Sequence, residues 1–72
     1  MDILEIKEKH QMRREEAADY LRKLADSLAR HNEVEFVQYG KTIRVDVADQ
    51  VEMEIELEIE DDESKLEVEI SW

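Results

Sequence analysis

Six glutamates in the last third of the chain have the residue type and the spacing that could support chemistry. They alternate with apolar residues along positions 51–60 and 66–72. A β-strand points successive side chains to opposite faces, so this spacing predicts an antiparallel hairpin with one acidic face and one apolar face. The predicted acidic face contains Glu52, Glu54, Glu56, Glu58, Glu67 and Glu69.

An acidic face of this kind is compatible with four roles. The most common is solvation of the outer side of a sheet. Docking of a basic protein surface would relieve the repulsion among the carboxylates and speed association. Divalent cations favour oxygen ligands, but side chains about 5 to 7 Å apart on a flat ladder do not converge as they do in a calcium site. Proton transfer needs a carboxyl group with a raised pKa in a cleft, which an open face does not offer.

The remaining polar residues offer little for catalysis or for metal binding. The acidic run 60–63 lacks the spaced ligands and central glycine of a calcium-binding hand. His10 and His31 are too far apart to form a helical metal pair, and no serine stands in the context of an activated nucleophile. We therefore predict that the protein is not an enzyme and has no catalytic residue, no metal site and no cofactor.

The negative charge is concentrated in the C-terminal third. The chain has a net charge of −11, yet residues 1–48 hold 10 acidic and 9 basic residues, whereas residues 49–72 hold 11 acidic residues and only Lys65 as a base. Nucleic-acid binding needs clustered Lys and Arg, so we expect none here. The leading hypothesis is a non-catalytic interaction module whose acidic face or sheet edge meets a basic protein or a second copy. The alternative is a protein that binds a divalent cation or needs salt to fold.

The length of 72 residues predicts a single domain covering residues 1–72. Cysteine is absent, so neither disulfides nor thiolate metal sites stabilise the fold. Secondary structure must supply the stability, with dimerisation as a possible aid, so both a monomer and a homodimer are compatible with the sequence. No apolar run reaches the roughly 18 residues of a membrane span, and the N-terminus has no signal-peptide pattern, so we expect a cytoplasmic protein without membrane contact.

The C-terminal hairpin has a strongly specified strand register. Pairing Ile59 with Leu66 places Leu57 opposite Val68 and buries one apolar face, and a register shifted by two residues keeps the same faces. In the first register Glu58 lies opposite Glu67 and Glu56 opposite Glu69. It also places Trp72 opposite Met53, where we expect the indole ring to cap the open end of the core against the helix.

The N-terminal half predicts a short strand at residues 2–10 and a helix at residues 11–32. The helix carries an apolar stripe with the spacing of one helical face, formed by Ala17, Leu21, Leu24 and Leu28. Asn32 is a suitable C-terminal stop, because Asn tolerates the left-handed conformation. The start is weaker, since Arg13 occupies the position where a Ser or Thr cap is preferred.

Residues 33–39 and 42–47 predict a second hairpin, joined by a turn at Gly40-Lys41. This turn pairs Phe36 with Val45 on the inner face. A short reversal at residues 48–50 would then pair Val45 with Met53 in the following strand. On the outer face, Arg44 would lie opposite Glu54 and relieve one glutamate.

Together these elements predict an α+β fold of order β-α-β-β-β-β: a five-stranded, mainly antiparallel sheet with one helix on its apolar face. We place the first strand beside the last, giving the strand order 1-5-4-3-2, because Lys7 and Lys9 could then neutralise Glu67 and Glu69. The alternative is a crossover that places the first strand beside the second.

Two segments of the chain resemble the amphi-Trp domain family. Residues 12–28 look like the helix of that family, with Glu15-Glu16-Ala17-Ala18 followed by Leu21, Leu24, Ala25 and Leu28. Residues 66–72 resemble its closing amphipathic strand, which ends in a tryptophan, here Trp72. The family commonly has Ser where this chain has Arg13, so a capping box with Glu16 is lost. The resemblance implies a small archaeal or bacterial domain of uncharacterised function and supplies no catalytic residues.

Overall fold

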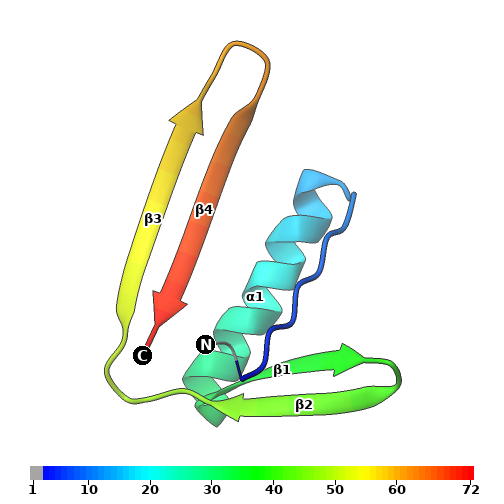
Figure 1. Cartoon of the computed structure of the whole chain (residues 1–72), viewed down its shortest axis with the longest axis vertical. Coiled ribbons are helices and arrows are strands. Elements are labelled where there is room, and N and C mark those ends of the chain that lie inside the picture. The colour runs from blue at the N-terminus through cyan, green and yellow to red at the C-terminus, as the bar shows by residue number, and fades with distance from the viewer. Residues whose placement is uncertain (1–2) are drawn as a thin grey trace.

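The computed structural model describes residues 3–72 and contains one helix and two separate β-hairpins (Figure 1). The elements are α1 (Arg14–His31), β1 (Glu33–Gln38), β2 (Lys41–Asp46), β3 (Glu52–Ile59) and β4 (Ser64–Ser71). β1 pairs with β2 and β3 pairs with β4, both antiparallel, and each pair is its own two-stranded sheet. The α+β class is therefore confirmed, but the single five-stranded sheet is not what the structure forms.

Helix α1 begins later than its sequence pattern predicts, because residue 13 is extended and its side chain makes no cap hydrogen bond. Glu15 and Glu16 occupy the first turn, where the helix dipole favours negative charge. The helix ends as expected at Asn32, which adopts a left-handed conformation with φ 55°. Its backbone N–H donates to the carbonyl of Ser27 and closes the last turn.

The β1–β2 hairpin turns at Tyr39-Gly40, one residue earlier than predicted. Both turn residues have positive φ, 52° and 73°, which is the requirement of a type I′ turn. This turn matches the right-handed twist of the strands, and glycine adopts its second position without strain. The pairing is consequently Phe36 with Ile43 and Val34 with Val45, so the predicted partners were wrong by two positions. A shift of two preserves the faces, and Phe36 still points inward and is half-buried.

The β3–β4 hairpin adopts the register shifted by two. Leu57 lies opposite Leu66 and Ile55 opposite Val68, so the pairing of Ile59 with Leu66 was wrong and its shifted alternative is confirmed. The observed register gains a further pair at the loop end, Ile59 with Ser64. The remaining four-residue loop is closed by the Glu60 N–H, which donates to the Glu63 carbonyl at 2.8 Å.

The first predicted strand is absent from the described part of the chain, since residues 3–13 form no ladder with any strand. Residue 2 lies outside the described residues. The segment instead runs beside α1 (Figure 1), and the Tyr20 hydroxyl of the helix donates to the Glu8 carboxylate at 3.1 Å. The strand order 1-5-4-3-2 was therefore wrong. Among residues 3–72, Lys7 and Lys9 form no ion pair with Glu67 or Glu69.

The two hairpins also do not pair with each other, so the predicted contact of Val45 with Met53 is absent. The Val47 N–H donates to the Asn32 carbonyl at 2.8 Å, which ties the end of β2 to the end of the helix. Beyond this bond residues 48–51 do not reverse. They bend at residues 49–50 and lead β3 away from β2 (Figure 1).

Helix α1 covers only the first hairpin. It contacts β1 and none of β2, β3 and β4. Leu24 and Leu28 of the helix and Val34, Phe36 and Ile43 of the hairpin are half-buried, yet none of residues 3–72 is fully buried. The Cα radius of gyration is 14.1 Å, whereas a compact chain of this length has about 11 Å. The described helix is not apolar over a sufficient length to cross a membrane.

Candidate functional site

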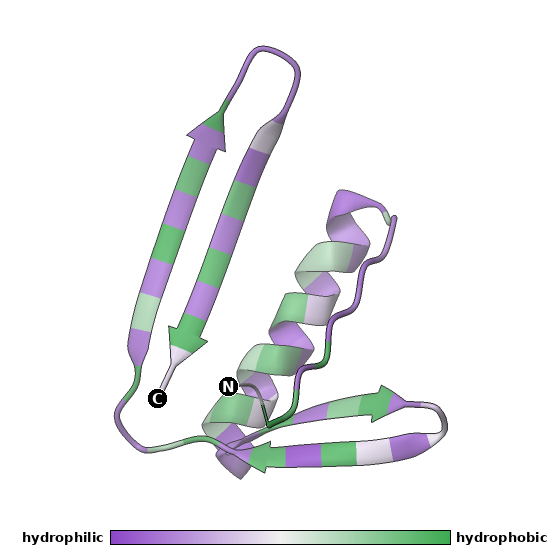
Figure 2. Ribbon diagram, viewed as in Figure 1, coloured by the Kyte–Doolittle hydropathy of each residue, from purple (hydrophilic) through white to green (hydrophobic). Residues whose placement is uncertain are grey.

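The six glutamates share one face of the β3–β4 hairpin, as their spacing predicts. They alternate with apolar residues in both strands, which gives the banded pattern of Figure 2. Every one of the six side chains is exposed to solvent. We use the term acidic face for this set: Glu52, Glu54, Glu56, Glu58, Glu67 and Glu69.

The shifted register decides which carboxylates face each other. Glu54 lies opposite Glu69 and Glu56 opposite Glu67, so the expected pairs of Glu58 with Glu67 and Glu56 with Glu69 were wrong. Glu58 instead lies opposite Lys65. A like-charge pair directly across a ladder is unfavourable by roughly 0.2 to 1 kcal/mol. Two such pairs remain in the centre of the acidic face.

Lys65 supplies the only positive charge close to this face among the described residues. Its ammonium group lies 2.7 Å from a carboxylate oxygen of Glu67. The hydrogen bond and charge of Glu67, followed by the charges of Glu58 and Glu63, raise the pKa of Lys65 above its ordinary value of 10.5. Within the described chain, Glu67 is the one member of the acidic face with a cationic group within 4 Å.

Arg44 does not relieve the acidic face, contrary to the sequence-based expectation that it would lie opposite Glu54. Its guanidinium lies 3.3 Å from Glu35 and 3.8 Å from Glu33, both across the β1–β2 ladder. The cause is the connection after β2, which leads β3 away and keeps it from pairing with β2. The arginine therefore balances the outer face of the first hairpin and leaves the second hairpin acidic.

The geometry of the described residues offers no preformed metal centre. No three His, Asp or Glu side chains in residues 3–72 are placed so that they could hold a metal ion together. The acidic residues of the loop at 60–63 are exposed. The acidic face is a flat ladder, so its oxygens point outward rather than toward a shared centre.

The opposite face of the β3–β4 hairpin is apolar and uncovered. We use the term bare face for this set: Met53, Ile55, Leu57, Ile59, Leu66, Val68 and Ile70. Its first six members are between 49% and 74% exposed, and Ile70 alone is half-buried. Trp72 is 55% exposed, so the prediction that it caps a closed core against Met53 was wrong. The cause is that, within residues 3–72, the helix does not lie over this hairpin.

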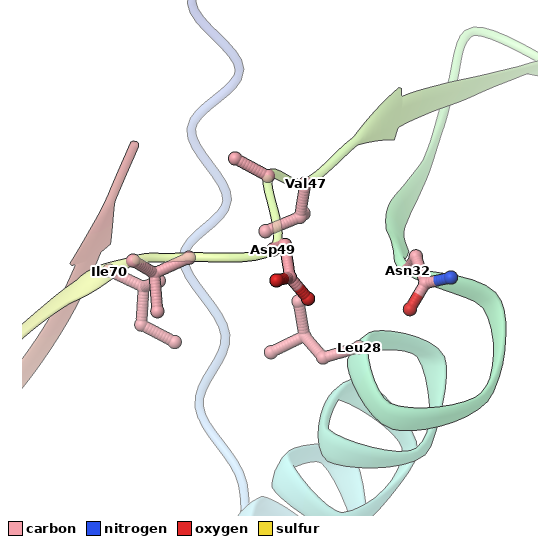
Figure 3. A pocket seen from close by; sticks show the side chains of 7 residues that line it. Leu28, Asn32, Val47, Asp49 and Ile70 are labelled. Atoms are coloured by element: carbon pink, nitrogen blue, oxygen red, sulfur yellow. The ribbon is translucent and has the colours of Figure 1, made fainter.

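A hollow of about 440 Å³ lies at the base of the hairpin, where the two halves of the chain approach each other. Leu28 and Asn32 line it from the helix, Val47 and Asp49 from the connection, and Ile70 from β4 (Figure 3). This is where Ile70 loses part of its exposure. The hollow is lined by the hinge itself, so its shape depends on the direction in which the connection leaves β2.

A polar cluster that the sequence did not predict lies at the other end of the helix. The Glu8 carboxylate accepts from the Tyr20 hydroxyl at 3.1 Å and lies 3.3 Å from the His10 ring nitrogen. Partial burial, followed by the hydrogen bond and charge of Glu8, raises the pKa of Tyr20 above 10.0. The cluster requires residues 8–10 to lie beside α1. A strand in the sheet was predicted for this segment, so Glu8 and His10 were not expected close to Tyr20.

Comparison with known proteins gives one match. The model of the Amphi-Trp domain family matches residues 2–72, which is essentially the whole chain. Neither a curated protein nor a protein of solved structure matches the chain.

Proposed function

The chain belongs to the Amphi-Trp domain family, and from this premise we propose that it is a non-catalytic interaction module whose acidic face docks a basic protein surface. The observation that carries the proposal is the two like-charge pairs opposed across the ladder, Glu54 with Glu69 and Glu56 with Glu67. Lys65 neutralises only Glu67 among these four. Both pairs lie in the middle of an exposed ladder, where a partner can reach them.

A basic partner would convert this repulsion into attraction. Lysine and arginine side chains placed between opposed glutamates remove the cost of each like-charge pair and add contacts of opposite charge. Residues 49–72 carry a net charge of −10, so the field of the hairpin also steers cationic surfaces toward it. Such binding weakens as salt is added, because exposed charges are screened over about 8 to 10 Å at physiological ionic strength.

The test compares two variants with the same change in charge. One carries Glu54→Gln, Glu56→Gln and Glu69→Gln on the acidic face, and the other carries Asp61→Asn, Asp62→Asn and Glu63→Gln in the loop. We expect proteins captured from native lysate at low salt to be lost with the first variant and retained with the second. Equal capture by both variants would reject the acidic face as the docking surface.

The alternative function, binding of a divalent cation, has a separate readout. Titration calorimetry with calcium and with magnesium would give saturable heat at low ion concentration for a specific site. A gradual rise in melting temperature with sodium chloride, without saturation, indicates screening of the repulsion instead. We expect the second result, since the flat ladder does not converge its oxygens on one point.

A further inference from the structure

The chain exposes far more surface than a folded monomer of its mass. Its accessible surface is 7206 Å² and its mass is 8.6 kDa. A compact monomer of this mass exposes about 4,700 Å². The excess is therefore about 2,500 Å² for each copy, and stable obligate interfaces bury about 2,000 to 5,000 Å² in total. An association of two copies that buried this excess would reach the obligate range.

The bare face contributes to that excess, because six of its seven side chains are between 49% and 74% exposed. An isolated two-stranded hairpin is marginally stable at best in water, so β3–β4 needs a surface that covers it. Covering a large apolar side chain removes it from water, which is the main favourable contribution to folding and association. The bare face offers seven such side chains, while the helix exposes Tyr20 and Leu21 on its own side.

The hairpin and the helix have matching lengths. Each strand of β3–β4 has 8 residues and spans about 27 Å, and α1 has 18 residues and also spans about 27 Å. The outward edges of β2 and β3 are both unpaired. The inward residues are apolar throughout β3 and, apart from Lys41 at the start of the strand, in β2. A hairpin laid beside β2 would therefore extend that sheet, with its bare face on the side of the sheet where α1 lies (Figure 1).

The connection leads the β3–β4 hairpin away from β2 of its own copy (Figure 1). Residues 47–51 span about 17 Å when extended, and the bond from Val47 to Asn32 fixes the direction in which they leave β2. The connection bends at residues 49–50 without folding β3 back onto β2 (Figure 1). Identical chains can exchange an element through a hinge of this kind. The β3–β4 hairpin of the observed protomer is already separated from its own β2, so no pairing must be broken before the exchange.

The charge distribution selects the surface of the second copy. Stacking two bare faces would bring together two segments of net charge −10, whereas residues 1–48 have a net charge of −1 and hold nine of the ten basic residues. Placing the hairpin of one copy on the helical part of the other keeps the two acidic segments apart. It also covers both apolar surfaces of each chain, while stacked hairpins would leave the helix uncovered.

We propose that two copies of the chain exchange their β3–β4 hairpins. Each hairpin then extends the β1–β2 sheet of the partner copy, and its bare face is covered by the helix α1 of that copy. The resulting sheet has the strand order β1-β2-β3-β4, with the last two strands from the second copy. The acidic faces remain on the outside. This inference concerns the opposite side of the hairpin from the docking proposal and does not depend on it.

The absence of cysteine from the sequence makes the exchange directly testable. Chains carrying only Val45→Cys are mixed, under denaturing and refolding conditions, with chains carrying only Met53→Cys, and are then oxidised. Exchange brings residue 45 of one copy beside residue 53 of the other. We expect a disulfide-linked heterodimer of about twice the chain mass on a non-reducing gel, and a dimeric mass for the unmodified chain by light scattering.

Three results would overturn the exchange. A monomeric mass with an internal disulfide in the Val45→Cys, Met53→Cys double variant would show that the hairpin closes onto its own helix. A linkage between two copies of residue 53 would show stacked bare faces. A monomeric mass without any disulfide would show that the face stays open or serves another partner.

A second pair of variants guards against simple loss of folding. Leu57→Glu places a charge on the bare face and is expected to convert the dimer to a monomer, while Glu56→Leu changes the neighbouring residue on the acidic face and is expected to leave the dimer intact. Circular dichroism of the helix reports whether α1 survives in each. A dimer that persists with Leu57→Glu contradicts the exchange, whatever the lysate capture shows.

Discussion

The two hairpins of this protein have the same local design and different surroundings. Both are antiparallel, both alternate apolar and polar residues, and neither depends on the other for its pairing. Strand β1 lies under α1, three apolar side chains of this hairpin are half-buried, and Arg44 balances its outer glutamates. The β3–β4 hairpin has no helix above it, and its outer face is almost wholly acidic.

The difference shows that alternation specifies faces but not what covers them. In both hairpins the pleat sorts polar from apolar residues, because a register shift of two leaves every side chain on its own face. Burial needs a second layer, and α1 supplies it to one hairpin only. The uncovered hairpin therefore offers two surfaces for the proposed contacts, the acidic face for a basic protein and the bare face for a second copy.

The largest expected effect separates the two apolar faces. Phe36→Ala removes a half-buried ring beneath α1 and should lower the free energy of unfolding by about 2 kcal/mol, roughly half of the cost at a fully buried site. Leu57→Ala should cost less than about 0.5 kcal/mol in dilute solution, as at other exposed sites. Urea unfolding of both variants at several protein concentrations measures the contrast.

How the cost of each substitution depends on protein concentration shows whether the same chain or a second copy covers each apolar face. The cost of Phe36→Ala should not change with concentration, since the helix of the same chain covers it. The cost of Leu57→Ala should grow as the second copy binds. If Leu57→Ala costs about 2 kcal/mol at every concentration, a helix of the same chain covers both hairpins, and the contrast between them fails.

An intermediate effect separates the two outer faces. Glu56→Gln removes one like-charge pair with Glu67 and should stabilise the protein by roughly 0.2 to 1 kcal/mol. Glu35→Gln removes the partner of Arg44 and should destabilise it by a similar or smaller amount. Thermal melts at low and high sodium chloride measure both, and the two shifts should shrink together as salt screens the charges. Shifts of the same sign would show that the two outer faces are electrostatically alike.

The smallest effect concerns the helical half at alkaline pH. The raised pKa of Tyr20 means that its neutral form is favoured in the folded state. The associated stability is present below pH 10.0, the ordinary tyrosine value, and is lost as the pH rises through the folded pKa. Absorbance titration of a Tyr39→Phe variant isolates Tyr20 and should give a midpoint above 10.0.

Removing the hydrogen-bond partner sharpens this test. In the Tyr39→Phe background, Glu8→Ala should move the midpoint only part of the way back toward 10.0, since partial burial, the largest cause, remains. Glu5→Ala is the matched control in the same segment and should leave the midpoint in place. An unchanged midpoint with Glu8→Ala would show that residues 3–13 do not lie against the helix in solution.

Several features were predictable because they depend on local geometry. The period of two identifies both hairpins and assigns all six glutamates to one face. The apolar stripe that begins at Ala17 and ends at Leu28 identifies the helix, and Asn32 marks its end because Asn tolerates the left-handed conformation. The registers were predictable only to within two residues, since turn geometry decides between alternatives that bury the same face. Sequence reasoning did not choose Tyr39-Gly40, because a tyrosine with positive φ is unusual.

Contacts between elements were not predictable from these patterns. Strand formation at residues 2–10 and pairing of β2 with β3 both require distant segments to meet, and alternation in one segment carries no information about its partner. Charge matching suggested Lys7 and Lys9 for the acidic face, but exposed ion pairs contribute too little to place a strand. The cluster of Glu8, His10 and Tyr20 was also not predicted, because it forms only when residues 8–10 meet the helix.

The sequence alone determined which residues share a face, where the helix ends and where the negative charge gathers, because side-chain period and charge are local properties of the chain. The tertiary structure decided that α1 covers one hairpin and leaves the other open. That outcome depends on the direction taken by residues 47–51 after the bond between Val47 and Asn32. A hinge direction is set by the sum of contacts on both sides, and no single segment encodes it.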